Sequence, residues 1–377
     1  MERPTTSHLF TSLTLGERTL ANRVVMAPMT RARTTNAASA PTQIHETYYG
    51  QRAGAGMIVS EGLAVSRDAI GGINLPGLFS HEQVAGWSSV TDAVHGTGSA
   101  LIAQLVHVGA MSHRDLLGGR LPLAPSSINP AGKVSTASGR VSTESPRAMS
   151  VDDIERTIAD YASAARNAMR AGFDGVEIHA HRGYLISQFA NPRSNRRTDG
   201  YGGDVKARSR FFLEVVRAVS ESIGTGILGI KIAPYWTEGE AHVFDDDSSA
   251  AYDYALTEVG KTVSYVHAMA PRTSAWADFV AEDRTALLQR VRSKFDGTVI
   301  ANGGFNAESA EAVLDAGFAD AVSFGLPFVA NPDLPRRLAL GLPWADPDRS
   351  SMYVGGTAGY IDYPTATIAD PLAAADH

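Results

Sequence analysis

The stretch VDDIERTIADYASAARNAMRAGFDGVEIH, residues 151–179, decides the fold. Its first part, Val151–Ala171, is amphipathic and is headed by Asp152 and Asp153, acidic residues that stabilise a helix N-terminus. Its last part, Gly175–His179, is short and contains the Val and Ile residues typical of a strand in a parallel sheet. The stretch therefore predicts one helix followed by one strand of an α/β protein.

The same alternation continues along the whole chain. The predicted strands are Val24–Met29, Met57–Ser60, Ala100–Leu105, Gly175–His179, Ile227–Ala233, Val263–Met269, Thr298–Ala301 and Asp320–Phe324. The predicted helices are Thr42–Ala53, Glu82–His95, Val151–Ala171, Ala207–Ser222, Ser248–Gly260, Glu282–Lys294, Asn306–Ala316 and Pro332–Leu340. Eight strands alternating with eight helices is the count of a (β/α)8 barrel. A doubly wound open sheet would more often carry a Gly-rich turn after its first strand, where this chain has Ala27-Pro28-Met29-Thr30.

The length of 377 residues allows two or three domains, but a (β/α)8 barrel can fill it as one. No low-complexity linker divides the chain, so we predict a single (β/α)8 TIM barrel over residues 1–377. Residues 106–150 form a long insertion after the third strand and are expected to cap the barrel mouth. A second long loop, residues 181–206, follows the fourth strand. Long loops at this end of a barrel are where function normally lies.

Composition excludes several classes of function. The chain has 33 basic and 40 acidic residues, a net charge of −7, which argues against nucleic-acid binding. It has no cysteine, so disulfides, thiolate metal sites and Cys nucleophiles are excluded. No signal peptide is recognised, and no apolar run approaches the roughly 20 residues of a membrane span. We expect a cytoplasmic protein without a membrane or nucleic-acid partner, and the oligomeric state stays open.

Polar side chains stand at the ends of the predicted strands, where a barrel would bring them to one mouth. They are Thr30, Glu61, Gln104, His107, His179, Lys231, His267 and Asn302. The alternative is a polar group that only caps a strand, and it applies above all to Glu61, His107 and His267.

Glycines follow the last two predicted strands, as Asn302-Gly303-Gly304-Phe305 and as Phe324-Gly325. Glycines there let backbone N–H groups and a helix N-terminus approach a phosphate, so we expect a phosphorylated ligand at this corner. A tight turn without a ligand is the alternative.

The run Val176–Tyr184 carries groups suited to acid–base chemistry. An imidazole or guanidinium at a strand end can hold an oxyanion, and a nearby phenol can give a proton. We do not expect a metal site, since no carboxylate completes a ligand set nearby and we predict that His179 and His181 point to opposite faces.

Six segments of the chain together resemble the Old Yellow Enzyme family. They are NRVVMAPMTR (22–31), QLVHVG (104–109), GFDGVEIH (172–179), SNRRTDGYGG (194–203), ANPDL (330–334) and GYIDYP (359–364). They span almost the whole chain in the family's order. The resemblance implies a (β/α)8 barrel that binds FMN, is reduced by NADPH or NADH, and transfers hydride from the flavin to an activated alkene.

The resemblance also implies roles for individual residues. Thr30 would hydrogen-bond the flavin near its C4 carbonyl, Gln104 would fix the pyrimidine edge, and Gly62 would pass close to the ring. His179 would be the first member of a pair that holds a substrate oxygen, and Tyr184 would protonate the α-carbon. The full set of implied cofactor residues is Pro28, Met29, Thr30, Gly62, Gln104, Lys231, Gly303, Gly304, Gly325 and Leu326; Tyr353 would be an aromatic residue near the substrate.

Five positions depart from the family pattern. The second oxygen-holding position is Arg182 instead of His or Asn, which suits a carboxylate or a developed oxyanion. Val106 replaces a tryptophan and Gly72 a tyrosine, so the substrate pocket is expected to be larger. Lys231 replaces an arginine at the flavin, and Leu326 replaces the arginine at the phosphate. Loss of a charge-assisted contact weakens binding roughly tenfold to hundredfold, so weaker FMN retention is expected.

Three functions stay open at this point. The first is an ene-reductase with an enlarged pocket for a bulky, oxygen-rich substrate such as an enone, a quinone or a secondary metabolite. The second is a diverged member that catalyses a non-reductive isomerisation or cyclisation, with its flavin static or absent. The third is a binding protein without enzymatic activity on the same scaffold.

Overall fold

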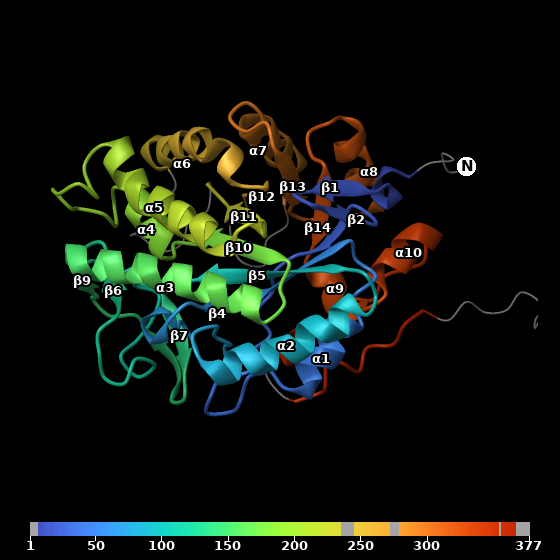
Figure 1. Ribbon diagram of the computed structural model, residues 1–377, viewed down its shortest axis with the longest axis horizontal. Helices are drawn as coiled ribbons and strands as arrows, with labels where there is room; N and C mark the ends of the chain where they lie inside the picture. Colours follow the sequence, from blue (N-terminus) through green and yellow to red (C-terminus); the bar gives the residue numbers. More distant parts are fainter. Residues whose placement is uncertain (1–6, 235–244, 272–278, 354–355, 367–377) are drawn as a thin grey trace, which may run out of the picture.

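The computed structural model describes residues 7–234, 245–271, 279–353 and 356–366. Eight parallel strands close into a barrel in chain order, with β14 pairing β3 to complete the ring (Figure 1). They are β3 (Val24–Met26), β4 (Met57–Ala64), β5 (Ala100–Val106), β10 (Gly175–Ala180), β11 (Ile227–Ile232), β12 (Tyr265–Met269), β13 (Thr298–Asn302) and β14 (Ala321–Phe324). The (β/α)8 barrel predicted from the sequence is confirmed.

Eight helices follow the strands as predicted, with small shifts of their ends. They are α1 (Gln43–Gly50), α2 (His81–His95), α3 (Val151–Arg170), α5 (Val205–Ile223), α6 (Asp246–Val259), α7 (Ala281–Arg292), α8 (Ala307–Asp315) and α10 (Leu334–Leu340). Two further α-helices in the described part of the chain were not predicted, α4 (Leu185–Ala190) after β10 and α9 (Leu326–Ala330) after β14. None of the helices in the described ranges is long and apolar enough to cross a bilayer.

The prediction for the first strand was too long, since β3 ends at Met26 and not at Met29. Pro28 has no backbone N–H and cannot donate to the sheet, which ends the strand. The start of α3 is fixed by Ser150, whose Oγ accepts from Asp153 N (3.1 Å) while Asp153 Oδ2 accepts from Ser150 N (2.9 Å). The hydrogen-bonded Arg147 guanidinium holds the pKa of Asp153 well below its usual range.

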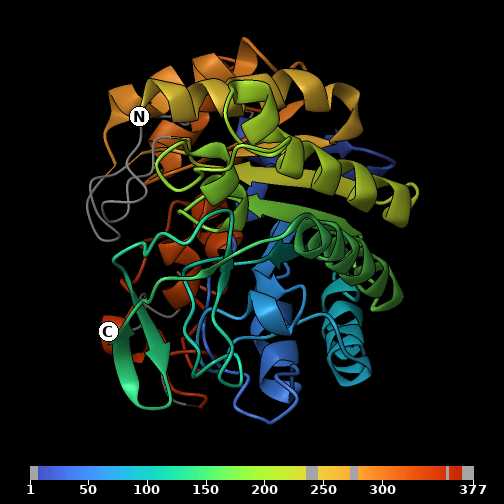
Figure 2. The ribbon, with the colours of Figure 1, turned by 90° about the vertical axis from the view of Figure 1, so that its left-hand side faces the viewer.

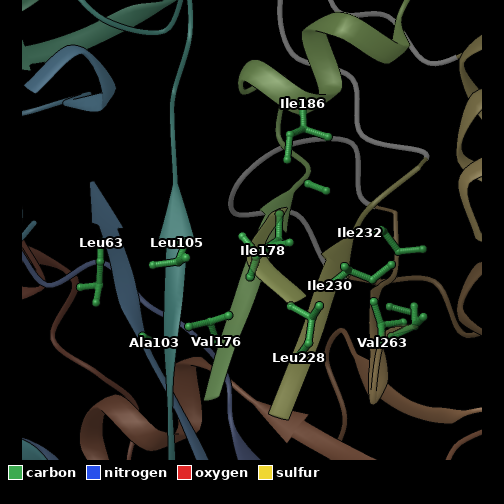
Figure 3. Packing of buried hydrophobic residues seen from close by; sticks show 14 of the residues in the cluster. Leu63, Ala103, Leu105, Val176, Ile178, Ile186, Leu228, Ile230, Ile232 and Val263 are labelled. Atoms are coloured by element: carbon green, nitrogen blue, oxygen red, sulfur yellow. The ribbon is translucent and has the colours of Figure 1, made fainter. Parts of the chain in front are cut away.

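Alternate residues of the strands face the helices and the barrel interior. Figure 3 shows buried side chains such as Val176 and Ile178 on β10, and Leu228 and Ile230 on β11, which belong to the large core cluster packed with the helices. The lower interior forms a second apolar cluster that includes Val25, Met57, Val59, Ala100, Ile102, Ile227, Tyr265, Ile300 and Ala321.

A hairpin that was not predicted closes the lower end of the barrel. Strands β1 (Leu13–Leu15) and β2 (Arg18–Leu20) pair antiparallel, and Leu15 and Leu20 join the lower apolar cluster. Figure 1 shows this hairpin at the end of the molecule opposite β6 and β9. The C-terminal ends of the barrel strands are therefore left as the accessible mouth.

The segment between β5 and α3 contains four short strands. They are β6 (Leu123–Ala124), β7 (Lys133–Thr136), β8 (Gly139–Ser142) and β9 (Arg147–Ala148), of which β7 and β8 form a hairpin seen in Figure 2. Ser135 O on β7 accepts a hydrogen bond from Ile73 N (3.2 Å). The hairpin thus lies against the loop that follows β4.

Gly229 on β11 gives a test of how the interior is packed. It pairs in register with Glu177 and with Tyr265, and an added Cβ would lie 2.0 Å from Tyr265 Cζ. We expect Gly229→Ala to lower the free energy of unfolding by about 1–3 kcal/mol, because a crowded interior forces neighbours out of place. The measurement is urea unfolding beside Gly96→Ala, where the nearest atom is 3.7 Å away. Equal losses in both variants would contradict this packing.

Candidate active site

The strand register gathers the residues predicted on four neighbouring strands. Gln104 on β5 lies opposite Gly62 on β4 and opposite Glu177 on β10. His179 lies opposite Lys231 on β11. Neighbouring strands are about 4.8 Å apart, so these residues share the upper end of the barrel.

The loops after β3, β13 and β14 bring the other predicted cofactor residues to the same end. Thr30 is exposed, and Pro28 and Met29 are half-buried. The remaining members are Gly303 and Gly304 after β13, and Gly325 and Leu326 after β14.

Directly inside the mouth, a chain of hydrogen bonds crosses the barrel. Glu177 accepts hydrogen bonds from Gln104 Nε2 (2.7 Å), Tyr265 Oη (3.0 Å) and His267 Nδ1 (2.8 Å). His267 Nε2 lies 2.7 Å from Ser323 Oγ. All five side chains are buried, with Glu177 and His267 fully shielded from solvent. The network therefore links strands β5, β10, β12 and β14.

The protonation states within this network follow from its contacts. Burial by itself would raise the pKa of Glu177, but His267, Lys231 and the amide of Gln104 hold it below its usual range. Burial lowers the pKa of His267 to about 4, and the charge of Lys231 acts in the same direction. A carboxylate only accepts, so neutral His267 donates from Nδ1 and its Nε2 accepts from Ser323.

Three aromatic rings stack at the end of β10. The His179 ring centroid lies 3.9 Å from that of His181 and 4.8 Å from that of Tyr184, with interplanar angles of 18° and 23°. Our prediction that His179 and His181 point to opposite faces was wrong. Residues two apart on an extended chain share one face, because successive side chains alternate.

Both histidines are neutral at physiological pH. Burial lowers the pKa of His179 to about 3, with the charges of Arg182 and Lys231 adding to the effect. Burial also lowers the pKa of His181 well below its usual value. The Nδ1 atom of each ring is buried without a hydrogen-bond partner among the described residues. Unpaired buried polar atoms are costly, so this point is suited to a polar ligand.

Arg182 occupies a strained backbone position. Its φ is +59° and that of Gly183 is +65°, while Tyr184 N donates to His181 O (3.3 Å) across the turn. A residue other than glycine in this region costs about 1–3 kcal/mol, and such strain is concentrated at functional sites. The turn separates Arg182 from the strand and carries Tyr184 back over His179.

The predicted substrate residues line this region unevenly. Tyr184 packs against the buried cluster of Val106, Val108 and Met111. A Cβ added at Gly72 would meet Leu75 Cδ1 at 3.3 Å and Ser135 O at 3.7 Å, so Leu75 and the β7–β8 hairpin already pack closely against this glycine.

Tyr353 lies on a different segment, and its side chain is 46% exposed. The preceding residue, Met352, accepts hydrogen bonds through its carbonyl from Arg31 Nε (3.2 Å) and Arg33 Nη1 (3.0 Å). Tyr353 is therefore fixed next to the loop that continues from Thr30.

The glycine turn after β13 is held by hydrogen bonds from an arginine. Gly303 and Gly304 have φ of +132° and +64°, a conformation that favours glycine. Arg284 on α7 donates from Nη1 to both of their carbonyls at 3.0 Å. The Leu326 side chain is 37% exposed at the start of α9.

Two features of the site fit FMN, namely the groups at the flavin ring edge and the cation at the glycine turn, and one feature, at position 326, does not. Gln104 offers polar atoms to the ring edge beside Gly62, and Arg284 places a cation at the Gly303–Gly304 turn, which packs closely against Phe279. Leu326 supplies no charged contact for the phosphate.

Some contacts of the candidate site were not predicted from the sequence. His107 Nδ1 accepts from Gly109 N (3.0 Å) and Glu61 Oε2 accepts from Arg31 N (3.2 Å), but His107 Nε2 and Glu61 Oε1 are buried without a partner among the described residues, so the strand-cap alternative accounts for only one atom of each. The partners of Glu177 were not predicted, although strict alternation along β10 and β12 would have placed Glu177 and His267 on one face. No sequence signal pointed to Arg284.

Other features of the surface do not compete with this site. Two hollows of about 470 Å³ each are present, one lined mainly by residues of α8 and α10 and the segment after α10, and one lined mainly by residues of α5 and α6. Within the described ranges, no group of three or more His, Asp or Glu residues could hold a metal ion.

Residues 8–344 match the NADH:flavin oxidoreductase / NADH oxidase family. The chain is 41% identical to chanoclavine-I aldehyde reductase fgaOx3 of Penicillium roqueforti, over 94% of this chain and 95% of that protein. Among solved structures, morphinone reductase has a TM-score of 0.89 at 41% identity, covering 96% of each chain. The Old Yellow Enzyme homologue of Zymomonas mobilis has a TM-score of 0.88 at 35% identity, covering 95% of this chain and 99% of its own.

The raised pKa of the Glu61 carboxyl, beside the barrel mouth, can be tested through the pH dependence of stability. Burial raises its pKa to about 7, against the opposing effects of Arg31 and Arg33. Because this pKa lies above that of the unfolded chain, the folded protein holds an extra proton between about pH 4.5 and 7 and loses stability as pH rises through that window. Glu61→Gln removes the ionisation, so its melting temperature relative to wild type should rise between pH 5 and pH 8. Glu17→Gln, exposed between β1 and β2, should show no such rise, and a flat difference for Glu61→Gln would refute the argument.

Proposed function

Since the chain belongs to the NADH:flavin oxidoreductase / NADH oxidase family, we propose that it reduces an activated C=C bond of a bulky, oxygen-rich substrate, with FMN as cofactor and NADPH or NADH as reductant. The resemblance to the Old Yellow Enzyme family is confirmed by the family match and by the solved structure of the Zymomonas mobilis homologue. The observation that carries the finer proposal is the stack of His179, His181 and Tyr184 beside the cationic Arg182.

The chain's own residues would polarise the alkene and complete its reduction. The chemistry that FMN would supply here, when bound, is a hydride for the β-carbon, with the nicotinamide as its source. Neutral His179 and charged Arg182 would hold the conjugated oxygen and stabilise the negative charge that develops on it. Tyr184 would pass its phenolic proton to the α-carbon and recover one from solvent, so hydride and proton together saturate the bond.

The names of two relatives agree with a complex substrate. One is named for chanoclavine-I aldehyde and another for morphinone. For this chain, the bulky-substrate part of the proposal is supported by Val106, a small residue at the end of β5 that packs near Tyr184. We propose that the hairpin within residues 106–150 forms the outer wall of this pocket.

The exposed Leu326 favours one second candidate. A site that holds the phosphate weakly would suit a non-reductive isomerisation or cyclisation, in which the flavin is static or absent. The visible spectrum of the purified protein and anaerobic oxidation of NADPH or NADH separate the two candidates. A yellow protein that oxidises the nicotinamide and reduces an enone supports reduction, and a colourless protein that gains no FMN on titration refutes it.

Tyr184→Phe tests the proton donor. We expect the oxidative half-reaction with a cyclic enone to slow by about tenfold to a thousandfold, in line with the loss of general acid catalysis. Reduction of the flavin by the nicotinamide should change little, because that half-reaction needs no proton from Tyr184. Stopped-flow measurement of both half-reactions decides the point, and an unchanged oxidative rate would exclude Tyr184 as the donor.

Arg182→Asn tests the preference for an anionic or strongly polarised substrate. A charge-assisted bidentate contact contributes about 1.5–3 kcal/mol, so kcat/KM for a bulky carboxylate or quinone should fall about tenfold to hundredfold. The value for cyclohexenone should change much less. Arg196→Asn, an exposed arginine farther along the same loop, is the matched control. Equal effects of Arg182→Asn on both substrates would show that Arg182 does not select between them.

A further inference from the structure

We propose that Glu177 is a positioning residue that sets which end of the Gln104 amide faces the flavin ring. The inference rests on the proposed placement of Gln104 at the cofactor. It goes beyond that placement by giving a role to a buried side chain that itself lies beneath the site.

The two oxygens of Glu177 have different partners. Oε1 accepts from Gln104 Nε2 at 2.7 Å, while Oε2 accepts from Tyr265 Oη at 3.0 Å and from His267 Nδ1 at 2.8 Å. Because a carboxylate can only accept, the amide of Gln104 has to present its nitrogen to Glu177. The Gln104 Oε1 atom is thereby turned away from Glu177, and it lies 3.6 Å from the point where a Cβ of Gly62 would stand.

The carboxylate itself is held against rotation and protonation. Tyr265 and His267 fix one oxygen, and His267 is backed by Ser323 Oγ at 2.7 Å. Burial opposes the charge on Glu177, but its hydrogen bonds and the nearby Lys231 keep its pKa below the usual range. The orientation of Gln104 is therefore imposed across the barrel by strands β10, β12 and β14.

This orientation matches the chemistry of the flavin ring edge. The pyrimidine ring of oxidised flavin carries one N–H between two carbonyl groups, so it needs one acceptor at that point. Gln104 Oε1 is an acceptor, whereas a reversed amide would place an NH2 group against the N–H. A buried donor that faces another donor loses its hydrogen bond and its solvation together.

Glu177→Gln should reverse the amide of Gln104. Tyr265 and His267 both donate to one oxygen, so the carbonyl of the newly introduced amide should stay with them and its NH2 should face Gln104. Gln104 would then turn its own oxygen inward and present NH2 to the ring. We expect Kd for FMN to rise about tenfold or more. The Kd for riboflavin, which lacks the phosphate, should rise by the same factor. The visible absorption of bound flavin should also shift.

Two further variants make the outcome decisive. The swap Gln104→Glu with Glu177→Gln restores a carboxylate–amide pair and again presents an acceptor oxygen, so it should recover most of the lost affinity. Tyr265→Phe removes one donor to Glu177 but leaves its contact with Gln104, so its effect on Kd should be small. If Glu177→Gln alone does not fold, as judged by thermal melting, the swap variant decides: near-native affinity supports the inference and weak binding overturns it.

Gln104→Ala separates this inference from the proposed function. If Gln104→Ala leaves the affinities for FMN and riboflavin unchanged, Gln104 does not contact the ring and the proposed cofactor placement fails. If Gln104→Ala weakens both ligands but Glu177→Gln weakens neither, the placement holds and the role of Glu177 is overturned.

Discussion

A single buried carboxylate, that of Glu177, constrains the upper half of the barrel. An unpaired charge in the interior would cost several kcal/mol, so folding has to bring its partners into place. Gln104, Tyr265 and His267 come from strands on both sides of β10, and Lys231 adds a positive charge nearby. These contacts form only when the barrel closes in the observed register. The lower half of the barrel interior is apolar, and the β1–β2 hairpin covers its end.

The barrel mouth above Glu177 carries neutral and charged side chains next to one another. Burial keeps His179 and His181 neutral, while Arg182 holds its charge on a strained turn at φ +59°. Such an arrangement favours a ligand oxygen that gains negative charge during reaction, because preorganised donors need no reorganisation when the charge appears. The stacked rings also place Tyr184 over His179, so the group proposed to hold the substrate oxygen and the group proposed to donate the proton lie side by side.

At the turn proposed to hold the FMN phosphate, the backbone conformation and the side-chain charge come from different elements. The Gly303–Gly304 turn has a conformation that favours glycine, and Arg284 fixes it by bonding both carbonyls from α7. Leu326, at the start of α9, leaves this corner without a charged group from its own loop. The positive charge therefore reaches the turn from the side of α7.

The order of strands and helices, and most of the residues at the mouth, could be predicted from the sequence because burial periodicity and strand ends are local features. The β1–β2 hairpin escaped prediction since each strand has three residues and only Leu15 and Leu20 are buried. The shared face of His179 and His181 was within reach of the sequence, and our error there was one of geometry. The hydrogen bonds of Glu177 could not be predicted from the sequence, because they join residues 73, 88 and 90 positions apart. Closure of the barrel is what brings such distant residues into contact, so the direction in which Gln104 faces follows from the tertiary structure alone.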